Sequence, residues 1–250
     1  MIEIKHGLTI IILTRNEKDN IEACISSAKF ADEIIVVDSG SEDNTRELAE
    51  KTGARVFLHP FEGFAAQRNF GLKQVTTDWV MYLDADERIT QEAAKQIQKA
   101  MERNEQYYYD IKRVNFIFGQ KQEHGAHRPD YPKRLFPTDS VTWEGVVHES
   151  PNVNLPKKRI SAALEHHTYS NWEMYFEKFN QYTTLMADKM KQNGKKASLV
   201  DMTIRPLFAF FRAYVIWQGF RDGLLGFIMS VIHAQYTFTK YVKLYYKIRG

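Results

Sequence analysis

Short apolar runs alternate with amphipathic stretches over the first hundred residues of the chain. The apolar runs are rich in β-branched residues and have few polar interruptions, which is typical of strands buried on both faces. We predict four such strands, at residues 8–14, 33–38, 55–59 and 79–83. Apolar positions at helical spacing predict helices at residues 20–30, 45–51, 65–74 and 91–103. Strands and helices that alternate in this way predict an α/β fold with a parallel sheet and right-handed crossovers.

After residue 107 the pattern becomes less regular. We predict a longer strand at 107–118, a polar loop at 119–132, and shorter strands at 133–136 and 146–149. The run from Ser170 to Glu173 has the spacing of a capping box, which predicts that a helix begins there and continues to Gly194.

The stretch 205–249 combines apolar and aromatic segments with lysine and arginine. Its longest uncharged run, residues 223–239, has 17 residues, fewer than the roughly 20 that a spanning helix needs. Helices of this composition are typical of the membrane interface. An alternative stays open, in which these helices pack on one another or form a homodimer. We therefore predict two domains, residues 1–168 and a helical region at 169–250.

Composition narrows the function classes. Hydrophobic residues make up 44% and charged residues 26%, which is enough for a packed core. The net charge of +3 is too small to indicate nucleic-acid binding. A single cysteine, Cys24, excludes an intrachain disulfide and fits a reducing compartment, and its neighbours Ile21 and Ile25 indicate core packing. Residues 1–7 lack a signal-peptide pattern, so we expect a cytoplasmic protein, peripheral to the inner membrane.

Polar residues follow three of the predicted strands at the point where each strand ends. They are Arg15-Asn16-Glu17, Asp38-Ser39-Gly40-Ser41 and Asp84-Ala85-Asp86. Ligands of parallel sheets bind beyond the carboxyl ends of the strands. Two carboxylates separated by one residue can bind a ribose and a divalent cation that also contacts substrate phosphates. Taken alone, the same tripeptide could be an acidic turn before a helix.

Two further residues could contribute to a site at this edge. Asp38 could accept a hydrogen bond from a ribose hydroxyl or a base N–H, although a nearby helix N-cap is the simpler interpretation. Arg68 lies on the third predicted helix and could bind a phosphate if it faces the cleft, or be an ordinary surface arginine.

Together, these segments resemble the family 2 inverting glycosyltransferases of GT-A fold. The resemblance covers roughly residues 8–150 and rests on Thr14-Arg15-Asn16-Glu17, Ile35 to Thr45, Ala66-Gln67-Arg68-Asn69 and Leu83 to Glu87. Three later stretches look like the bacterial branch that glucosylates the heptose of the lipopolysaccharide inner core. They are Lys133 to Phe136, Trp143 to Glu149, and Tyr214 to Gly226 with Lys240-Tyr241.

The resemblance implies a role for each matching residue. The nucleoside, most often uridine, would be held by Thr14, Glu17 and Asp38, with Asn16 also among the substrate-binding residues. Arg68 and Asp84 would contact ribose and phosphate. Asp86 would ligate the Mg²⁺ or Mn²⁺ that bridges the diphosphate. The signature of processive family members is absent, which favours transfer of a single sugar.

Inverting transfer also needs a carboxylate that takes the proton of the acceptor hydroxyl. The candidates are Glu149 and Glu144, and we favour Glu149 because it ends a short strand-like run. His148 could be a further metal or phosphate ligand. A solvated glutamate and a structural histidine are the simpler interpretations of these residues.

The leading hypothesis is therefore a metal-dependent transferase that moves one sugar, glucose by resemblance, from a UDP-sugar to a lipid-linked saccharide such as lipopolysaccharide core. A second hypothesis is transfer to a polyprenyl phosphate, whose phosphate could be bound by Arg128, Lys133 and Arg134. A third, from a different class, is a non-catalytic membrane-binding module.

Overall fold

The computed structural model describes residues 7–103, 105–145 and 149–249. The chain forms two compact units, Met1–Arg113 with Asp130–His166, and Val114–Pro129 with His167–Gly250. The contacts thus group residues 114–129 with the C-terminal helices, whereas the sequence placed them in the first domain. The predicted boundary after residue 168 stays a prediction.

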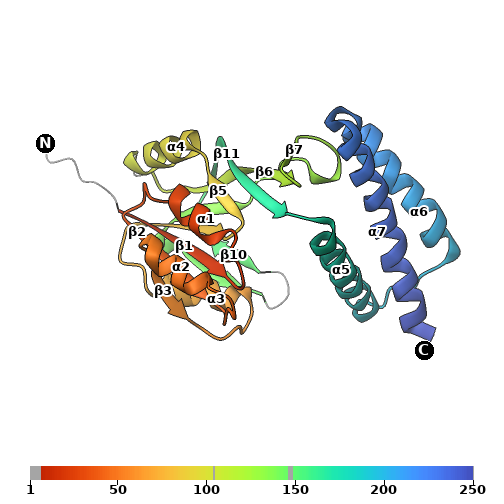
Figure 1. Cartoon of the computed structure of the whole chain (residues 1–250), viewed down its shortest axis with the longest axis horizontal. Coiled ribbons are helices and arrows are strands. Elements are labelled where there is room, and N and C mark those ends of the chain that lie inside the picture. Colours follow the sequence, from red (N-terminus) through yellow and green to blue (C-terminus); the bar gives the residue numbers. More distant parts are fainter. Residues whose placement is uncertain (1–6, 104, 146–148, 250) are drawn as a thin grey trace, which may run out of the picture. The chain divides into compact units, whose positions relative to one another are not determined.

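The first four strands of the first unit are parallel, as the sequence predicts (Figure 1). They lie in the order β3-β2-β1-β4, with bounds β1 Leu8–Thr14, β2 Glu33–Asp38, β3 Arg55–Leu58 and β4 Trp79–Asp84. The helices that connect them are α1 Ile21–Ser27, α2 Thr45–Thr52 and α3 Phe64–Leu72. Each predicted strand and helix in this region is present, with ends that differ by a few residues.

The remainder of the sheet is different, and its strand order continues β8-β6-β11-β5. The bounds are β5 Glu87–Ile89, β6 Tyr108–Ile117, β7 Gln120–Gln122, β8 Lys133–Pro137 and β11 Lys157–Tyr169. The pairs β4–β8, β6–β8, β6–β7 and β5–β11 are antiparallel. The predicted α/β fold is present, but the expectation of a mostly parallel sheet holds only for β1–β4. Between α4, Gln91–Glu102, and β11, the described residues contain no further α-helix that could serve as the crossover that parallel pairing requires.

A short hairpin that the sequence did not predict completes the first unit. It consists of β9, Val141–Glu144, and β10, Ser150–Val153, which pair in antiparallel fashion. Of the strand expected at 146–149, residues 146–148 lie outside the described residues, and Glu149 precedes β10.

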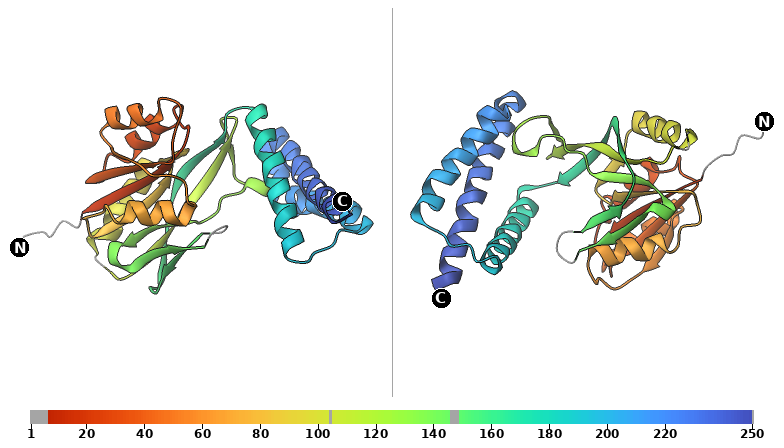
Figure 2. Two further views of the ribbon diagram at one scale, coloured as in Figure 1. Left: turned by 90° about the horizontal axis from the view of Figure 1, so that it is seen from below. Right: turned by 180° about the vertical axis from the view of Figure 1, so that it is seen from behind.

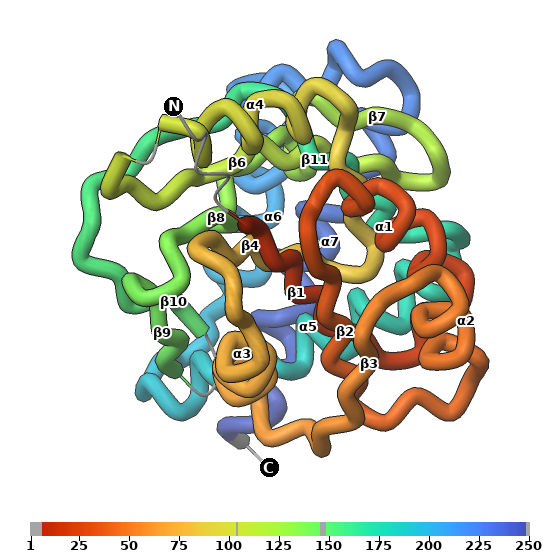
Figure 3. The backbone as a smooth tube through the Cα atoms, turned by 90° about the vertical axis from the view of Figure 1, so that its left-hand side faces the viewer, coloured from red at the N-terminus to blue at the C-terminus, as the bar shows by residue number. Residues whose placement is uncertain are grey.

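The two faces of the sheet have separate cores. Ile10 and Ile12 of β1 pack in one cluster with residues of α1, α2 and α4, whereas Ile11 packs in another with residues of α3 and with Trp143. Figure 3 shows α1 and α3 on opposite sides of β1. This follows from the strand period of two, because successive side chains point to opposite faces.

The second unit is helical. Its main helices are α5 Trp172–Gln192, α6 Leu199–Phe211 and α7 Gly223–Arg249. Figures 1 and 2 show α7 beside both α5 and α6, and α7 contacts both. The helix expected to begin near Ser170 is present, but its N-cap is Asn171, whose side chain accepts a hydrogen bond from the Met174 N–H at 2.8 Å. The capping box occurs instead at the start of α6, between Ser198 and Asp201.

Within the described ranges, none of the helices is both long enough and apolar enough to cross a bilayer. The second unit nevertheless exposes many large apolar side chains. Those of α6 are Leu199, Val200, Ile204, Leu207, Phe208 and Phe211.

Candidate active site

The three predicted strand ends are neighbours in the sheet. Thr14 of β1 is paired with Asp38 of β2, and Leu13 of β1 is paired with Asp84 of β4. Parallel pairing brings these carboxyl ends to the same edge. The polar residues after β1, β2 and β4 therefore meet there.

Hydrogen bonds from Arg88 and Cys24 to backbone carbonyl groups fix the turn that carries the acidic residues. Asp84 ends β4 and Glu87 begins β5. The Arg88 guanidinium donates to the carbonyl oxygens of Ala85 and Glu87 at 2.9 and 2.8 Å. The buried Cys24 thiol donates to the Asp84 carbonyl at 3.5 Å, and burial raises the pKa of this thiol. Cys24 is thus a core residue, as expected.

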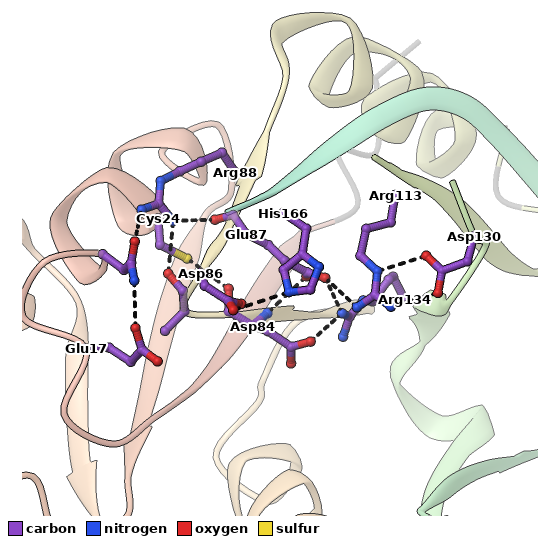
Figure 4. A network of polar contacts seen from close by, with 12 residues as sticks. Glu17, Cys24, Asp84, Asp86, Glu87, Arg88, Arg113, Asp130, Arg134 and His166 are labelled. Atoms are coloured by element: carbon purple, nitrogen blue, oxygen red, sulfur yellow. Dashed lines mark hydrogen bonds and ion pairs between the residues drawn. The ribbon is translucent and has the colours of Figure 1, made fainter. Parts of the chain in front are cut away.

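Asp84 lies between two buried arginines, Arg68 and Arg134, of which Figure 4 shows Arg134. Its Oδ2 accepts a hydrogen bond from Arg134 Nη2 at 2.5 Å, and its Oδ1 lies 3.5 Å from Arg68 Nη2. Burial alone would raise the pKa of Asp84, but Arg134 and Arg68 hold it well below its usual range. Asp84 is therefore ionised, and it is one-third exposed at the edge of the sheet.

The carboxylate of Glu87, which is fully buried, lies next to Asp84. Glu87 Oε1 lies 2.5 Å from Arg134 Nη2 and 3.2 Å from Arg113 Nη1, and Glu87 Oε2 accepts a hydrogen bond from the Asp84 N–H at 3.1 Å. Burial raises the pKa of Glu87 despite these arginines, and the Asp84 carboxylate raises it further. Glu87 thus contacts both the Asp84 N–H and Arg134, the arginine that is paired with the Asp84 carboxylate.

Asp86 faces a histidine from a distant strand. Its Oδ2 lies 3.2 Å from Nε2 of His166 in β11 (Figure 4). Among the described residues, no lysine or arginine pairs with Asp86. Asp86 and His166 therefore form a carboxylate–imidazole pair whose side chains are 18% and 14% exposed.

Arg68 connects Asp84 to a second candidate carboxylate. Its Nη2 lies 3.6 Å from Oε1 of Glu149, and its guanidinium carbon lies 4.6 Å from the centroid of the Trp143 ring. Nε and Nη1 of Arg68 are buried and have no hydrogen-bond partner among the described residues. Arg68 is thus a buried residue beside Asp84 and Glu149 rather than an ordinary surface arginine.

The neighbour of Arg68 fixes the hairpin to α3. Asn69 Nδ2 donates to the Trp143 carbonyl at 2.8 Å, and the Trp143 N–H donates to Asn69 Oδ1 at 2.9 Å. Glu144 follows Trp143 on the strand, so its side chain points to the other face. Glu144 is exposed and accepts a hydrogen bond from Asn152 at 2.8 Å. The two candidate bases therefore differ, because of the two only Glu149 is shown in contact with Arg68.

The loop after β1 is bound to the loop after β2. Asn16 has a φ of 54°, its N–H donates to Ser41 Oγ at 2.8 Å, and its Oδ1 accepts from the Glu42 N–H at 2.8 Å. The Glu17 N–H donates to Thr45 Oγ1 at 2.9 Å. The Asn16 side chain and the Glu17 backbone thus shape the rim of the site.

Thr14 and Asp38 differ in what they could offer a ligand. Thr14 Oγ1 is buried and has no hydrogen-bond partner in the described part of the chain. Asp38 is fully buried, and its carboxylate accepts the N–H groups of Gly40 and Ser41 at 3.0 and 2.8 Å and the Ser41 hydroxyl at 2.5 Å. The Asp38 carboxylate therefore stabilises the turn formed by residues 38–41. A contact between Asp38 and a nucleoside stays a prediction.

Few side chains among the described residues could act as ligands of a divalent cation. They contain no group of three or more His, Cys, Asp or Glu side chains that could hold a metal ion. His148, the expected second ligand, lies outside the described residues. Asp86 and His166 offer one carboxylate and one imidazole, which suits an ion that also binds substrate phosphates and water.

The sequence pattern predicted no role in the site for Glu87, Arg113 or His166. It predicted that Arg134 could bind the phosphate of a polyprenyl phosphate acceptor. The structure shows Arg134 buried and bound to Asp84 and Glu87. Glu87 follows the acidic tripeptide directly, and this was the one signal available in the sequence. His166 could not be found, since its partner Asp86 lies far from it along the chain, in the turn between β4 and β5.

Comparison with known proteins decides the family. A family model described as Glycosyl transferase family 2 matches residues 9–162. The chain belongs to this family. It is a glycosyltransferase, and the resemblance noted in the sequence is confirmed.

Two relatives match this glycosyltransferase over most of both chains. An uncharacterized glycosyltransferase of Rickettsia conorii is 29% identical over 95% of this chain and 89% of its own. The lipopolysaccharide core biosynthesis glycosyltransferase LpsC of Rhizobium meliloti is 27% identical over 96% of this chain and 93% of its own.

Solved structures overlap with the glycosyltransferase only in part. Glucosyl-3-phosphoglycerate synthase from Mycobacterium tuberculosis, in complex with Mn²⁺, UDP and glucosyl-3-phosphoglycerate, is 24% identical over 45% of this chain and 44% of its own, with a TM-score of 0.37. A mycobacterial protein is 16% identical over 66% of each chain, with a TM-score of 0.42.

Proposed function

We propose that this glycosyltransferase moves one glucose, with inversion, from UDP-glucose to a lipid-linked saccharide such as lipopolysaccharide core. Two relations support this choice. The family 2 model covers the strands and the edge described above. The LpsC relative, which acts in lipopolysaccharide core biosynthesis by its name, matches nearly the whole chain.

The observation that carries the proposal is the position of Arg68. Its guanidinium lies between Asp84 and Glu149 and has two further N–H groups without partners in the described residues. A guanidinium in this setting suits a phosphate of the donor. The same side chain would thus hold the leaving group next to the carboxylate that activates the acceptor.

Glu149 is the proposed base. Inverting transfer requires a carboxylate on the acceptor side, which takes the hydroxyl proton as the new C–O bond forms and the bond to the diphosphate breaks. Glu149 is about one-quarter exposed, so an acceptor hydroxyl can reach it. Arg68 Nη2 lies 3.6 Å from Oε1 of Glu149, so the guanidinium holds this carboxylate at the site.

Asp86 and His166 would hold a divalent cation, Mg²⁺ or Mn²⁺, when the donor is bound. Such an ion offsets the negative charge that develops on the leaving diphosphate. Asp86 suits this role better than Asp84, because Asp84 is already paired with two arginines. The pair with His166 orients the Asp86 carboxylate.

The test is UDP release from UDP-glucose in the presence of a delipidated core-saccharide acceptor. Glu149→Gln should lower kcat by at least about a hundredfold, the lower range of general-base effects. Glu144→Gln, on the other face of the hairpin, should keep most of the activity. Equal rates for the two variants would remove Glu149 from this role.

The acceptor is expected at a membrane surface, and α6 supports this part of the proposal. Its exposed apolar stripe includes Leu207, Phe208 and Phe211, which are 69%, 54% and 50% exposed. Residues 193–249 contain nine lysines and arginines and two acidic residues. Apolar helix faces beside basic residues suit binding to anionic lipid.

Vesicle flotation tests this membrane surface. Full-length protein should float with vesicles that contain phosphatidylglycerol, and Phe208→Ser with Phe211→Ser should abolish flotation. The matched control replaces Phe61 and Phe64, an equally exposed aromatic pair of the first unit, in the same way. Flotation that both double variants retain would contradict membrane docking through α6.

Transfer to a polyprenyl phosphate remains the second candidate. Its proposed phosphate site included Arg134, which is 4% exposed and occupied by Asp84 and Glu87. The structure therefore favours the saccharide acceptor. Offering both acceptors in one assay separates the two, because only one labelled product should form.

A further inference from the structure

Basic side chains gather around Trp217 in the second unit. The guanidinium carbon of Arg128 lies 3.8 Å from the centroid of the Trp217 ring, and that of Arg212 lies 4.5 Å from the same centroid. The His233 ring lies 6.1 Å away, and Lys240 is close enough to lower the pKa of His233. Arg128, Arg212, His233 and Lys240, here called the Trp217 cluster, all belong to one compact unit.

The charge of this cluster is not balanced by acidic residues. Among the described residues, no carboxylate forms an ion pair with Arg128, Arg212 or Lys240. The pKa of Lys240 is lowered by burial and by the cations around it, Arg212 first. Gathered cations repel one another, and the repulsion is stronger when they are partly buried.

The nearest acid along the chain, Asp222, is already occupied. Its Oδ1 lies 2.7 Å from His124 Nδ1, and its Oδ2 accepts the N–H groups of Glu123 and His124 at 3.0 and 2.8 Å. Asp222 therefore joins two segments of the second unit. It is not a counter-ion for the Trp217 cluster.

Two polar atoms of the cluster are buried and unpartnered. Arg212 Nε and His233 Nε2 have no hydrogen-bond partner in the part of the chain that the structure describes. A buried donor left without an acceptor destabilises the folded protein. The Arg212 Nε–H donor, together with the unbalanced charge, indicates that an acceptor from outside the chain completes this site.

The backbone around Trp217 is unusual and firmly held. Residues 212–216 form a π-helical turn, which is rare and often found at functional sites. Gln218 follows with a φ of 57°, and the Gly125 N–H donates to the Trp217 carbonyl at 2.8 Å. An added Cβ at Gly219 would lie 2.8 Å from the Ala213 carbonyl oxygen. The conformation that presents Trp217 is thus fixed from several sides.

We propose that the Trp217 cluster is a second binding site of this glycosyltransferase, specific for a phosphate-type anion. Guanidinium groups match the geometry of phosphate oxygens, and stacking on an indole ring orients the guanidinium while leaving its N–H edge available. The phosphate can come from a phospholipid headgroup or from a soluble phosphate compound. The site uses no residue of the proposed active site, so it does not rest on the proposed function.

Thermal unfolding of the full chain with inorganic phosphate tests the chemistry, at constant ionic strength set with chloride. Phosphate should raise Tm in a saturable way. Arg212→Gln should weaken the apparent Kd by about tenfold, the equivalent of one charge-assisted hydrogen bond. Arg221→Gln is the matched control, because Arg221 is exposed and bonded to Gln218. Its Kd should be unchanged.

A second arm identifies the source of the phosphate. Vesicles of phosphatidylcholine with and without phosphatidic acid are compared by flotation. Loss of the phosphatidic-acid-dependent binding in Arg212→Gln, but not in Arg221→Gln, assigns the site to a lipid headgroup. Flotation that is equal in both variants, with phosphate binding weakened only in Arg212→Gln, assigns it to a soluble phosphate compound.

Arg128→Gln provides an independent test if Arg212→Gln does not fold, since Arg128 is exposed on a loop. Arg128→Gln should weaken the binding of the same ligand, inorganic phosphate or phosphatidic acid, that Arg212→Gln is expected to weaken. The proposal is overturned if neither inorganic phosphate nor phosphatidic acid binds more weakly to these variants than to Arg221→Gln. None of these measurements involves UDP or sugar transfer, so failure of the proposed function would not affect them.

Discussion

At the scale of single residues, arginines position the acidic strand ends. Arg134 Nη2 contacts both Asp84 and Glu87, while Arg68 reaches Asp84 from the other side. The planar guanidinium can serve several oxygens at once, which the point charge of a lysine does less well. The direction and the ionised state of Asp84 therefore depend on the two arginines beside it.

This arrangement predicts a large effect of Arg134→Gln on stability. The substitution leaves the buried Glu87 with Arg113 as its remaining cation, so the free energy of unfolding should fall by about 3 kcal/mol. Arg55→Gln, which breaks the more exposed pair with Glu33, should cost less than about 1 kcal/mol. Urea unfolding measures both, and similar losses would contradict the structural role of Arg134.

The sequence predicted the acidic residues of the site but not their partners. Asp84 and Asp86 could be found because they follow a buried strand within one tripeptide. Arg134 and His166 could not, since their contacts arise from strands β8 and β11, far along the chain. A pattern read along the sequence contains no direct information about such long-range pairs.

At the scale of elements, burial decided which strands could be predicted. Strand β1 has an almost continuous apolar run and is buried on both faces, so its pattern is unambiguous. Strand β11 begins with Lys157-Lys158-Arg159 and includes Glu165 and two histidines, and its pattern does not resemble a strand. The β9–β10 hairpin is short and half exposed. These elements of the rim carry Glu149 and His166, which explains why the site was predicted only in part.

Helix α3 depends on its glycine. A Cβ added at Gly71 would lie 2.8 Å from Ile11 Cγ2 and 3.1 Å from Val37 Cγ2, so the helix could not keep its distance from the sheet. Gly71→Ala should lower the free energy of unfolding by about 1–3 kcal/mol. It should also lower kcat, because Arg68 and Asn69 lie on the same helix. Full activity together with unchanged urea unfolding would show that the contact is easily relieved.

At the scale of the whole molecule, charge divides the sequence. Residues 193–249 have a net charge of +7, from nine basic and two acidic residues, whereas the chain as a whole has +3. The acidic part includes the strand ends of the first unit, and the basic part includes Arg212, His233 and Lys240 of the Trp217 cluster. Composition alone did not reveal this division, because the two parts nearly cancel.

The Trp217 cluster predicts a pH dependence of stability. Burial, and then the charges of Arg212, Lys240 and Arg128, together lower the pKa of His233 from its ordinary value of 6.5 to about 4. The unfolded chain thus takes up this proton before the folded protein does, so stability is lost as pH falls from 6.5 towards 4. In phosphate-free buffer, Tm of His233→Gln should fall less over this range. Equal slopes for both proteins would contradict the prediction.

The central claim is that Asp86, at the edge where three strands end, binds a divalent cation together with a nucleoside diphosphate. Thermal unfolding of the full chain with UDP, with Mn²⁺ and with both measures this directly and needs no acceptor. We predict that UDP and Mn²⁺ together raise Tm by about 5 °C, more than the sum of their separate effects, and that Asp86→Asn loses this extra rise. An Asp86→Asn variant with the full combined rise, or a wild-type protein with none, would contradict the account.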